Sequence, residues 1–261
     1  MNWWQALVLG VVQGLTEFLP VSSDGHLALA QQLMGIRTPG VVVEVTVHVA
    51  TLAAVVIVYW QKITELTRGL VGGSPGARRE FLLLVLATIP AGLAGVFLKD
   101  WVARTYNSLW IIGVGFLVTG TVLWSTRRRA AMSSNPDIDA RRAGGMGVAQ
   151  AFAILPGVSR SGSTVAAGMW SGLDPIRAAE FSFLMAIPVI LGAAVLEAPE
   201  ILREEVAVGR VPLLLSFAAA MVSGIFAIRF LVALLRRRAF HRFAIYCWAL
   251  GLAVLVVWLK R

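Results

Sequence analysis

The sequence predicts an all-α polytopic membrane protein, and its composition and apolar runs support this class. Of the 261 residues, 58% are hydrophobic and only 14% are charged, with a mean hydropathy of +0.78. An average soluble domain is roughly half apolar and about a quarter charged. Segments such as 82–87 and 252–259 are apolar at every position, whereas strands of a transmembrane β-barrel alternate apolar and polar residues. We therefore expect membrane helices, and no nucleic-acid partner in spite of the net charge of +9.

Six apolar segments are predicted to be transmembrane helices, since a span takes about 20 apolar residues. Two further apolar stretches, 3–34 and 146–173, are each interrupted near the middle by proline, glycine and serine. Their halves are too short to span, and interrupted backbone at membrane depth is tolerated only inside protein or beside a wet cavity. We therefore expect both stretches to form re-entrant helical hairpins. The six predicted spans are 41–60, 81–98, 108–126, 177–196, 211–235 and 243–259.

Charged loops predict how these segments are oriented. Arginine and lysine concentrate in loops 61–80, 127–142 and 236–242, which are cytoplasmic by the positive-inside rule. Loop 197–210 carries four glutamates and is expected on the outside. Six spans satisfy all four loops when both chain ends lie outside.

This topology implies an inverted repeat, because the first hairpin enters from outside, the second enters from the cytoplasm, and three spans follow each. The sequence also suggests a duplication, since segment 10–25 resembles segment 147–162. We expect one membrane domain, 1–261, built from a first repeat, 1–126, and a second repeat, 146–261. Inverted repeats with broken helices place polar sites near the bilayer midplane, where the repeats meet.

The first hairpin contains polar and ionisable side chains, and ionisable groups inside a membrane are costly and usually functional. Gln13 and Glu17 share a helix face at the i,i+4 spacing. A buried hydrogen-bonding network that closes a broken helix is the structural alternative. Serine caps alone would be enough for that purpose, so Glu17 and His26 favour a functional site. The polar residues of this hairpin are Gln13, Glu17, Ser22, Ser23, Asp24 and His26.

The second hairpin has the composition of an anion-binding turn. Hydroxyls and backbone N–H groups at a helix start bind anions, and Arg160 adds a bidentate donor suited to phosphate. The alternative is that Arg160 snorkels to the interface or pairs with Glu17 for structure alone. If the two hairpins meet, acid/base groups lie beside a phosphate clamp, which predicts hydrolysis of a phosphorylated lipid. The residues of the predicted clamp are Ser159, Arg160, Ser161, Gly162 and Thr164.

At these residues the chain resembles a known family. Segment 13–26 is similar to the (Glu/Gln)-x-x-x-Glu motif, and the Ser-Ser-x-Gly-His that follows it, of undecaprenyl-diphosphatases of the bacitracin-resistance type. Segment 156–162 matches the second signature, Pro-Gly-x-Ser-Arg-Ser-Gly, and segment 180–188 also resembles a family segment. The resemblance covers nearly the whole chain.

The resemblance implies a bacterial plasma-membrane enzyme with a site on the periplasmic side. Such an enzyme hydrolyses undecaprenyl diphosphate, a polyprenyl lipid, to the monophosphate carrier of cell-wall synthesis, and it confers bacitracin resistance. The implied cofactor is a divalent cation, Mg²⁺ or Ca²⁺. The oligomeric state stays open between a monomer and a homodimer.

Site roles follow from motif positions in the resemblance. The nucleophile stays open among Ser23, His26 and a water molecule. The implied catalytic residues are Glu17, Ser23, His26 and Arg160. The implied phosphate-binding residues are Ser22, Ser159, Arg160, Ser161, Gly162 and Thr164. The implied cation ligands are Glu17 and Gln13, with Asp24 as a further candidate.

Asp24 is a departure from the family, which usually has threonine at this position. An additional carboxylate either strengthens cation binding or repels the anionic substrate. Glu44 and His48 share a face of the first span at the i,i+4 spacing, and helix-packing hydrogen bonds are our leading interpretation of both. Glu180 lies near a predicted helix start, where a carboxylate is favoured by the helix dipole, so we interpret it as structural.

Two other functions fit part of the pattern. A lipid-phosphate flippase or secondary transporter uses the same inverted repeats and broken helices. The phosphatidic-acid-phosphatase pattern fails on spacing, because it requires a histidine soon after its Ser-Arg pair, and the next histidine after Arg160 is His241.

Overall fold

The computed structural model describes residues 1–36, 41–106, 108–129, 134–203 and 208–260. Within these ranges the chain forms eleven α-helices and one short 3₁₀ helix, Phe240–Arg242. The α-helices are α1 Trp3–Phe18, α2 Ser23–Leu33, α3 Val41–Val58, α4 Trp60–Val71, α5 Pro75–Thr105, α6 Leu109–Ser125, α7 Ala140–Phe152, α8 Arg160–Trp170, α9 Pro175–Arg203, α10 Arg210–Arg236 and α11 Phe243–Leu259.

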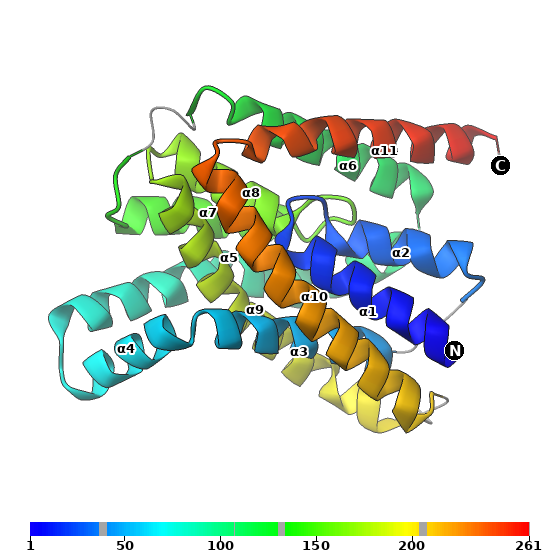
Figure 1. Cartoon of the computed structure of the whole chain (residues 1–261), viewed down its shortest axis with the longest axis horizontal. Coiled ribbons are helices and arrows are strands. Elements are labelled where there is room, and N and C mark those ends of the chain that lie inside the picture. Colours follow the sequence, from blue (N-terminus) through cyan, green and yellow to red (C-terminus); the bar gives the residue numbers. More distant parts are fainter. Residues whose placement is uncertain (37–40, 107, 130–133, 204–207, 261) are drawn as a thin grey trace.

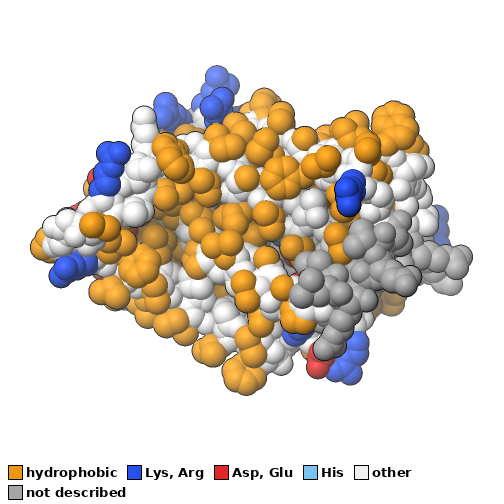
Figure 2. All heavy atoms as spheres, turned by 90° about the horizontal axis from the view of Figure 1, so that it is seen from below, with side chains coloured by type: hydrophobic (Ala, Val, Ile, Leu, Met, Phe, Trp, Pro, Cys, Tyr) orange, Lys and Arg blue, Asp and Glu red, His pale blue; other side chains and the backbone are white. Residues whose placement is uncertain are grey.

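Five helical segments of the described chain are long and apolar enough to cross a membrane: α3, α5, α9, α10 and the segment that ends with α11. Helix α6 is also apolar but has only 17 residues. Hydrophobic side chains cover most of the face shown in Figure 2, and Lys and Arg side chains lie mainly near its edges. Because water would not tolerate so much exposed apolar surface, the molecule is a polytopic membrane protein.

The first apolar stretch is broken into α1 and α2, as its proline and serines predict. Pro20 disfavours a helical conformation in the preceding residue, and Leu19 is extended with φ −66° and ψ 145°. Ser22 then caps α2, where its Oγ accepts a hydrogen bond from the backbone N–H of Gly25 at 3.4 Å. The two helices form a hairpin around this turn (Figure 1).

The second apolar stretch is broken into α7 and α8. Helix α7 starts at Ala140, before the predicted start at 146, because Asp139 caps it by accepting from the Arg142 backbone N–H at 2.8 Å. The same hydrogen bond holds the pKa of Asp139 below its usual value. Gly157, at φ +89°, forms the turn, and the Oγ of Ser159 caps α8 by accepting from the Gly162 N–H at 3.0 Å.

Two loop predictions were wrong. Segment 61–80 is mostly helical, because α4 occupies Trp60–Val71 and α5 begins at Pro75. Helix α4 is amphipathic, with one polar and one apolar face, so a search for continuously apolar segments does not detect it. Loop 197–210 begins later than predicted, since α9 continues to Arg203. Its glutamates at 204 and 205 lie outside the described residues.

The two halves of the chain interleave. In Figure 1, α1 lies along α10, α11 along α6, and α7 packs against α5. Small residues permit these approaches: a Cβ on Gly14 of α1 would lie 2.3 Å from the Ala220 carbonyl oxygen of α10. A Cβ on Gly115 of α6 would lie 2.3 Å from the Pro156 carbonyl oxygen. Close backbone packing therefore brings the two hairpin turns together inside the bundle.

Candidate functional site

The two hairpin turns meet in an ion pair. One oxygen of Glu17, near the end of α1, lies 2.6 Å from Nη2 of Arg160, the first residue of α8. The Glu17 side chain is 7% exposed and that of Arg160 is 17% exposed. The Ser161 hydroxyl also donates to the Leu19 carbonyl oxygen at 3.2 Å. The two motifs, far apart in the sequence, thus form one buried site.

Glu17 accepts further hydrogen bonds through its second oxygen, Oε2. The Gln13 amide donates to it at 3.0 Å, and the Ser23 hydroxyl donates to it at 2.8 Å. The amide oxygen of Gln13 is buried and has no hydrogen-bond partner within the described structure. A carboxylate, an amide oxygen and an oriented hydroxyl are therefore grouped on one side of Arg160.

Helix α9 holds Arg160 from the opposite side. Nη1 of Arg160 donates to the Ser182 carbonyl oxygen at 3.2 Å, so the guanidinium extends between α1 and α9. The Ser182 hydroxyl lies 2.6 Å from that of Thr164. Thr164 also donates to the Arg160 carbonyl oxygen at 2.8 Å. The Thr164 hydroxyl, expected among the phosphate-binding groups, is therefore used within the protein.

The turn that precedes α8 is held by Thr119 of α6. The Thr119 hydroxyl donates to the Gly157 carbonyl oxygen at 2.8 Å and accepts from the Ser159 N–H at 2.9 Å. The hydroxyls of Ser159 and Ser161 are 3.2 Å apart, and the Gly162 N–H is occupied by the helix cap. The first turn of α8, the positive end of the helix dipole, thereby lies beside Glu17 and Leu19, which Arg160 and Ser161 contact.

His48 of α3 is the imidazole that lies beside Glu17. Its Nε2 is 4.0 Å from Oε2 of Glu17 and 3.9 Å from Oδ1 of Asp24. Its Nδ1 is 2.8 Å from the Glu44 carbonyl oxygen. This hydrogen bond lies within α3 rather than between helices, and the other ring nitrogen of His48 faces the site. Asp24, the departure from the family pattern, is the residue that it meets there.

His26 faces another direction. Nδ1 of its ring lies 2.7 Å from the Ser22 carbonyl oxygen, and Nε2 lies 2.7 Å from the Tyr246 hydroxyl on α11. Its ring also packs against Phe116, with the ring centroids 5.1 Å apart. In the described part of the chain, neither a hydrogen bond nor an ion pair joins His26 to Glu17.

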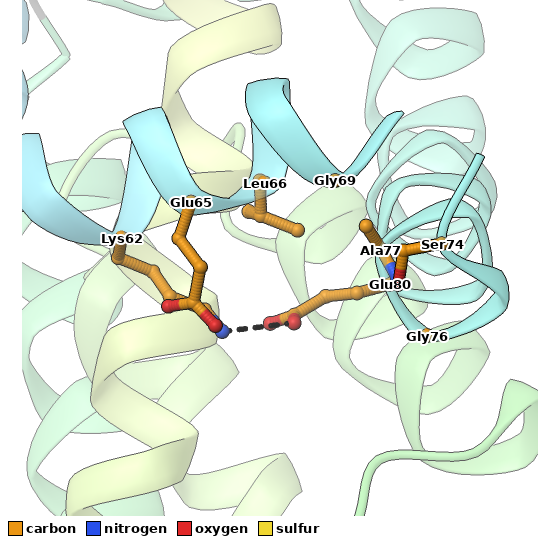
Figure 3. Close-up of a pocket in the computed structure, with 8 residues that line it drawn as sticks. All are labelled: Lys62, Glu65, Leu66, Gly69, Ser74, Gly76, Ala77 and Glu80. Carbon is orange, nitrogen blue, oxygen red and sulfur yellow. Dashed lines mark hydrogen bonds and ion pairs between the residues drawn. The ribbon is translucent and has the colours of Figure 1, made fainter. Parts of the chain in front are cut away.

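A second polar cluster lies in a pocket of about 340 Å³ between α4 and α5 (Figure 3). Lys62 and Glu65 extend from α4 toward Glu80 of α5, and Nζ of Lys62 is 3.0 Å from Glu80. Arg177 of α9 contacts the other Glu80 oxygen at 2.5 Å and also contacts Glu180. These ion pairs tie three helices together, which agrees with the structural interpretation of Glu180.

Comparison with known proteins identifies the family. The model of the bacitracin resistance protein BacA family matches residues 6–253. The chain belongs to this family. It is 38% identical to the undecaprenyl-diphosphatase of Carboxydothermus hydrogenoformans over 264 residues, 98% of both chains. It is 39% identical to those of Bacteroides fragilis, over 98% of both chains, and Parabacteroides distasonis, over the full length of both.

The divalent cation that the motif resemblance implies can be tested against the donors that this site offers. Mg²⁺ binds through one or two carboxylates, and substrate phosphates and water complete its shell. Glu17 and the unpartnered Gln13 amide oxygen are suitable oxygen ligands. Among the described residues no set of three or more His, Cys, Asp or Glu side chains forms a complete metal cluster. The donors therefore fit a cation that shares its shell with a diphosphate.

Two residues at the site, Ser182 and Tyr246, stood outside the expectations based on the sequence motifs, and His48 had helix packing as its leading interpretation. His48, Ser182 and Tyr246 come from α3, α9 and α11, and each reaches the hairpins only through tertiary packing. The sequence could have indicated a place for His48 in the site, because a histidine four residues after a glutamate is unusual in an apolar span. A serine and a tyrosine in apolar helices carry no comparable signal.

Proposed function

We propose that the protein is an integral-membrane lipid diphosphatase that hydrolyses undecaprenyl diphosphate to undecaprenyl phosphate and inorganic phosphate. The observation that carries the proposal is the buried contact between Glu17 and Arg160, with the Ser23 hydroxyl 2.8 Å from Glu17. This contact unites a carboxylate, a hydroxyl and a guanidinium from two separate motifs. Membership of the BacA family and the names of its full-length relatives support the same substrate.

Ser23 is the proposed nucleophile, and Glu17 is its base. The hydroxyl already donates to Glu17, whereas both nitrogens of His26 have other partners. The Ser23 oxygen bonds to the terminal phosphorus as the bridging P–O bond breaks, and undecaprenyl phosphate leaves with the electron pair. The Ser23 proton passes to Glu17. Water then attacks the phosphorus of the phosphoserine, and the Ser23 oxygen leaves with the electron pair and takes the proton back from Glu17. One water hydrogen stays on the inorganic phosphate as P–OH, and the other enters solvent as a proton.

Arg160 is the proposed phosphate clamp. Its guanidinium is held by the Ser182 carbonyl oxygen, which leaves the Glu17 side facing the site. A planar guanidinium binds two phosphoryl oxygens at once, and the helix start at Ser159 and Ser161 adds favourable dipoles. A bound cation supplies charge neutralisation to the leaving phosphate, and Glu17 and Gln13, with Asp24 nearby, are the residues that would hold it.

The proposed architecture extends the observed helices to six spans. Helix α6 is the sixth span, and α1–α2 and α7–α8 are re-entrant hairpins in inverted repeats 1–126 and 146–261. Both chain ends lie at the same end of the molecule, as six spans require (Figure 1). The interleaving of α1 with α10 and of α7 with α5 supports two related halves. We place the protein in the bacterial inner membrane, with the site open to the periplasm.

The deciding experiment measures phosphate release from undecaprenyl diphosphate and farnesyl diphosphate by the purified protein, with and without a chelator. Glu17→Gln and Ser23→Ala should abolish release. Ser171→Ala, at the far end of α8 with its hydroxyl bonded to the Gly168 carbonyl oxygen, is the matched control and should keep it. Absence of release with every divalent cation would contradict the enzyme and favour the flippase or transporter. Release by Ser23→Ala would instead identify water as the nucleophile.

A further inference from the structure

Tyr246 and the Ser22 carbonyl hold the His26 ring between them. The Tyr246 hydroxyl lies 2.7 Å from Nε2 of His26, and the two rings stack with centroids 5.7 Å apart and planes 9° apart. Phe116 meets the same imidazole edge-on at an angle of 80°. His26 is thus held by α11 and α6 as well as by its own helix.

These contacts determine which nitrogen of the neutral ring carries the proton. The Ser22 carbonyl oxygen can only accept, so the His26 Nδ1 that lies 2.7 Å from it must carry hydrogen. In the neutral ring Nε2 then holds a lone pair and accepts from the Tyr246 hydroxyl. Tyr246 is therefore the donor that matches this one tautomer of His26.

The Ser22 carbonyl belongs to a strained turn. Ser22 has φ +67° and ψ 104°, a backbone conformation that residues other than glycine seldom adopt. The His26 N–H, at 3.3 Å, and the His26 ring, at 2.7 Å, both donate to its carbonyl oxygen. The next residue is Ser23, whose hydroxyl lies 2.8 Å from Glu17. Hydrogen bonds thus run from Tyr246 through His26 to the Ser22 carbonyl oxygen, and the Ser22–Ser23 peptide bond joins that carbonyl to the proposed nucleophile.

We propose that Tyr246 is a positioning residue for the hydrolysis, acting through His26 to keep the Ser22 turn in the conformation that directs Ser23 to Glu17. The expected effect of Tyr246 on the rate of hydrolysis rests on the proposed function. Its expected effect on the hydrogen bonding of His26 rests on the observed contacts alone. Tyr246 need not touch the substrate. Its removal should therefore slow turnover and leave substrate affinity largely unchanged.

The test compares Tyr246→Phe, which keeps the ring and removes the hydroxyl, with Tyr59→Phe. Tyr59 packs on Phe183 and lies outside the site, so it is the matched control. We expect Tyr246→Phe to lower kcat about tenfold, with KM changed by less than about twofold, the size of effect of one lost orienting hydrogen bond. The control should match the wild type in both constants.

A second readout follows His26 itself. The chain has three histidines, so 15N-histidine NMR in lipid nanodiscs resolves each ring, and a His26→Gln sample assigns the His26 signals. In Tyr246→Phe the Nε2 signal of His26 should move toward that of a ring nitrogen without a hydrogen-bond donor. The signals of His48 and His241 should stay in place.

The outcomes separate the two proposals. An unchanged His26 spectrum in Tyr246→Phe overturns the inference, whatever the rate. A wild-type kcat overturns it as well, and so does a defect confined to KM, which would mean direct contact with substrate. A shifted spectrum, in a protein whose wild type releases no phosphate, supports the contact and contradicts the proposed function.

Discussion

Glu17 is a carboxylate buried in an apolar bundle, and its place there depends on Arg160. A buried ion pair adds little net stability, because desolvation offsets most of the attraction between its charges. Removal of one partner is different, since it leaves a buried charge without compensation. The 2.6 Å pair is therefore both part of the proposed chemistry and a condition for the first hairpin to fold.

Arg160→Gln should lower the free energy of unfolding by about 3–5 kcal/mol, because Glu17 stays buried without a cation. Glu17→Gln combined with Arg160→Gln should recover much of that loss, although it stays inactive. Thermal unfolding in detergent measures both. Arg128→Gln, in an exposed loop, is the control and should unfold like the wild type. A double variant no more stable than Arg160→Gln would contradict the role of the pair.

Asp24 and His48 should behave as a coupled pair. Asp24 adds a negative charge beside the binding site of an anionic substrate, and the His48 ring nitrogen faces it at 3.9 Å. We expect His48→Gln to raise KM about fivefold, equivalent to about 1 kcal/mol for a partly exposed pair. Asp24→Thr in the same background should return KM to the wild-type range. Equal effects of His48→Gln with and without Asp24 would show that the two residues act independently.

At the scale of residues, the sequence predicted the motif members that are close together along the chain. Gln13, Glu17 and Ser23 gather in the structure, because one helix face and one turn bring them together. The pairing with Arg160 was an open alternative, since it depends on how two hairpins dock. The partners of His26 were not predictable, because Phe116 of α6 and Tyr246 of α11 reach it only through tertiary packing.

At the scale of elements, the contact between α1 and α10 depends on glycine. Gly14→Ala would place a Cβ 2.3 Å from the Ala220 carbonyl oxygen and 2.1 Å from the Ser223 hydroxyl. We expect a loss of about 1–3 kcal/mol in stability, typical of overpacking, together with reduced activity. Gly92→Ala on α5 meets no atom within 4 Å and should be neutral or slightly stabilising, because alanine is the better helix former. Denaturant titration in detergent compares the two variants.

The broken hairpins were predictable at this scale because the cause is local. Pro20 and the extended Leu19 end α1, and Gly157 allows the left-handed turn before α8. Helix α4 was not predictable by hydropathy, because its stability comes from one apolar face and from partners such as Glu80, which binds Lys62. A search for apolar spans is silent about amphipathic helices that lie along a membrane surface or another helix.

At the scale of the whole molecule, the proposed topology predicts which side of the membrane each chain end and each basic loop faces. In a Cys247→Ala background, which removes the buried native thiol, single cysteines are placed at exposed positions of each end. Lys260→Cys should react with a membrane-impermeant thiol reagent added to intact cells. Arg128→Cys and Arg237→Cys should react only after permeabilisation, because basic loops stay in the cytoplasm. The opposite pattern would reverse the topology and move the proposed site to the other face.

The division into apolar segments was accessible from hydropathy, but the interleaving of the halves was not. Packing of α1 on α10 rather than on a helix of its own half depends on matched small residues such as Gly14 and Ala220, spaced far apart in the chain. The hydropathy of individual residues does not indicate which helices pack against each other. The duplicated segments suggested two related halves, and tertiary packing determined how they are joined.

The distance along the chain between Glu17 and Arg160 also affects biosynthesis. Arg160, the positively charged partner of Glu17, is the 143rd residue that the ribosome adds after Glu17. At about 5–20 residues per second, this elongation takes roughly 7–30 s. The supporting helix α10 and the tyrosine of α11 emerge later still. During that interval the first hairpin carries a carboxylate without its Arg160 partner, and burying such a group in lipid is costly. We therefore expect the first hairpin to reach its final position only after Arg160 and helix α10, on which α1 packs, have been translated.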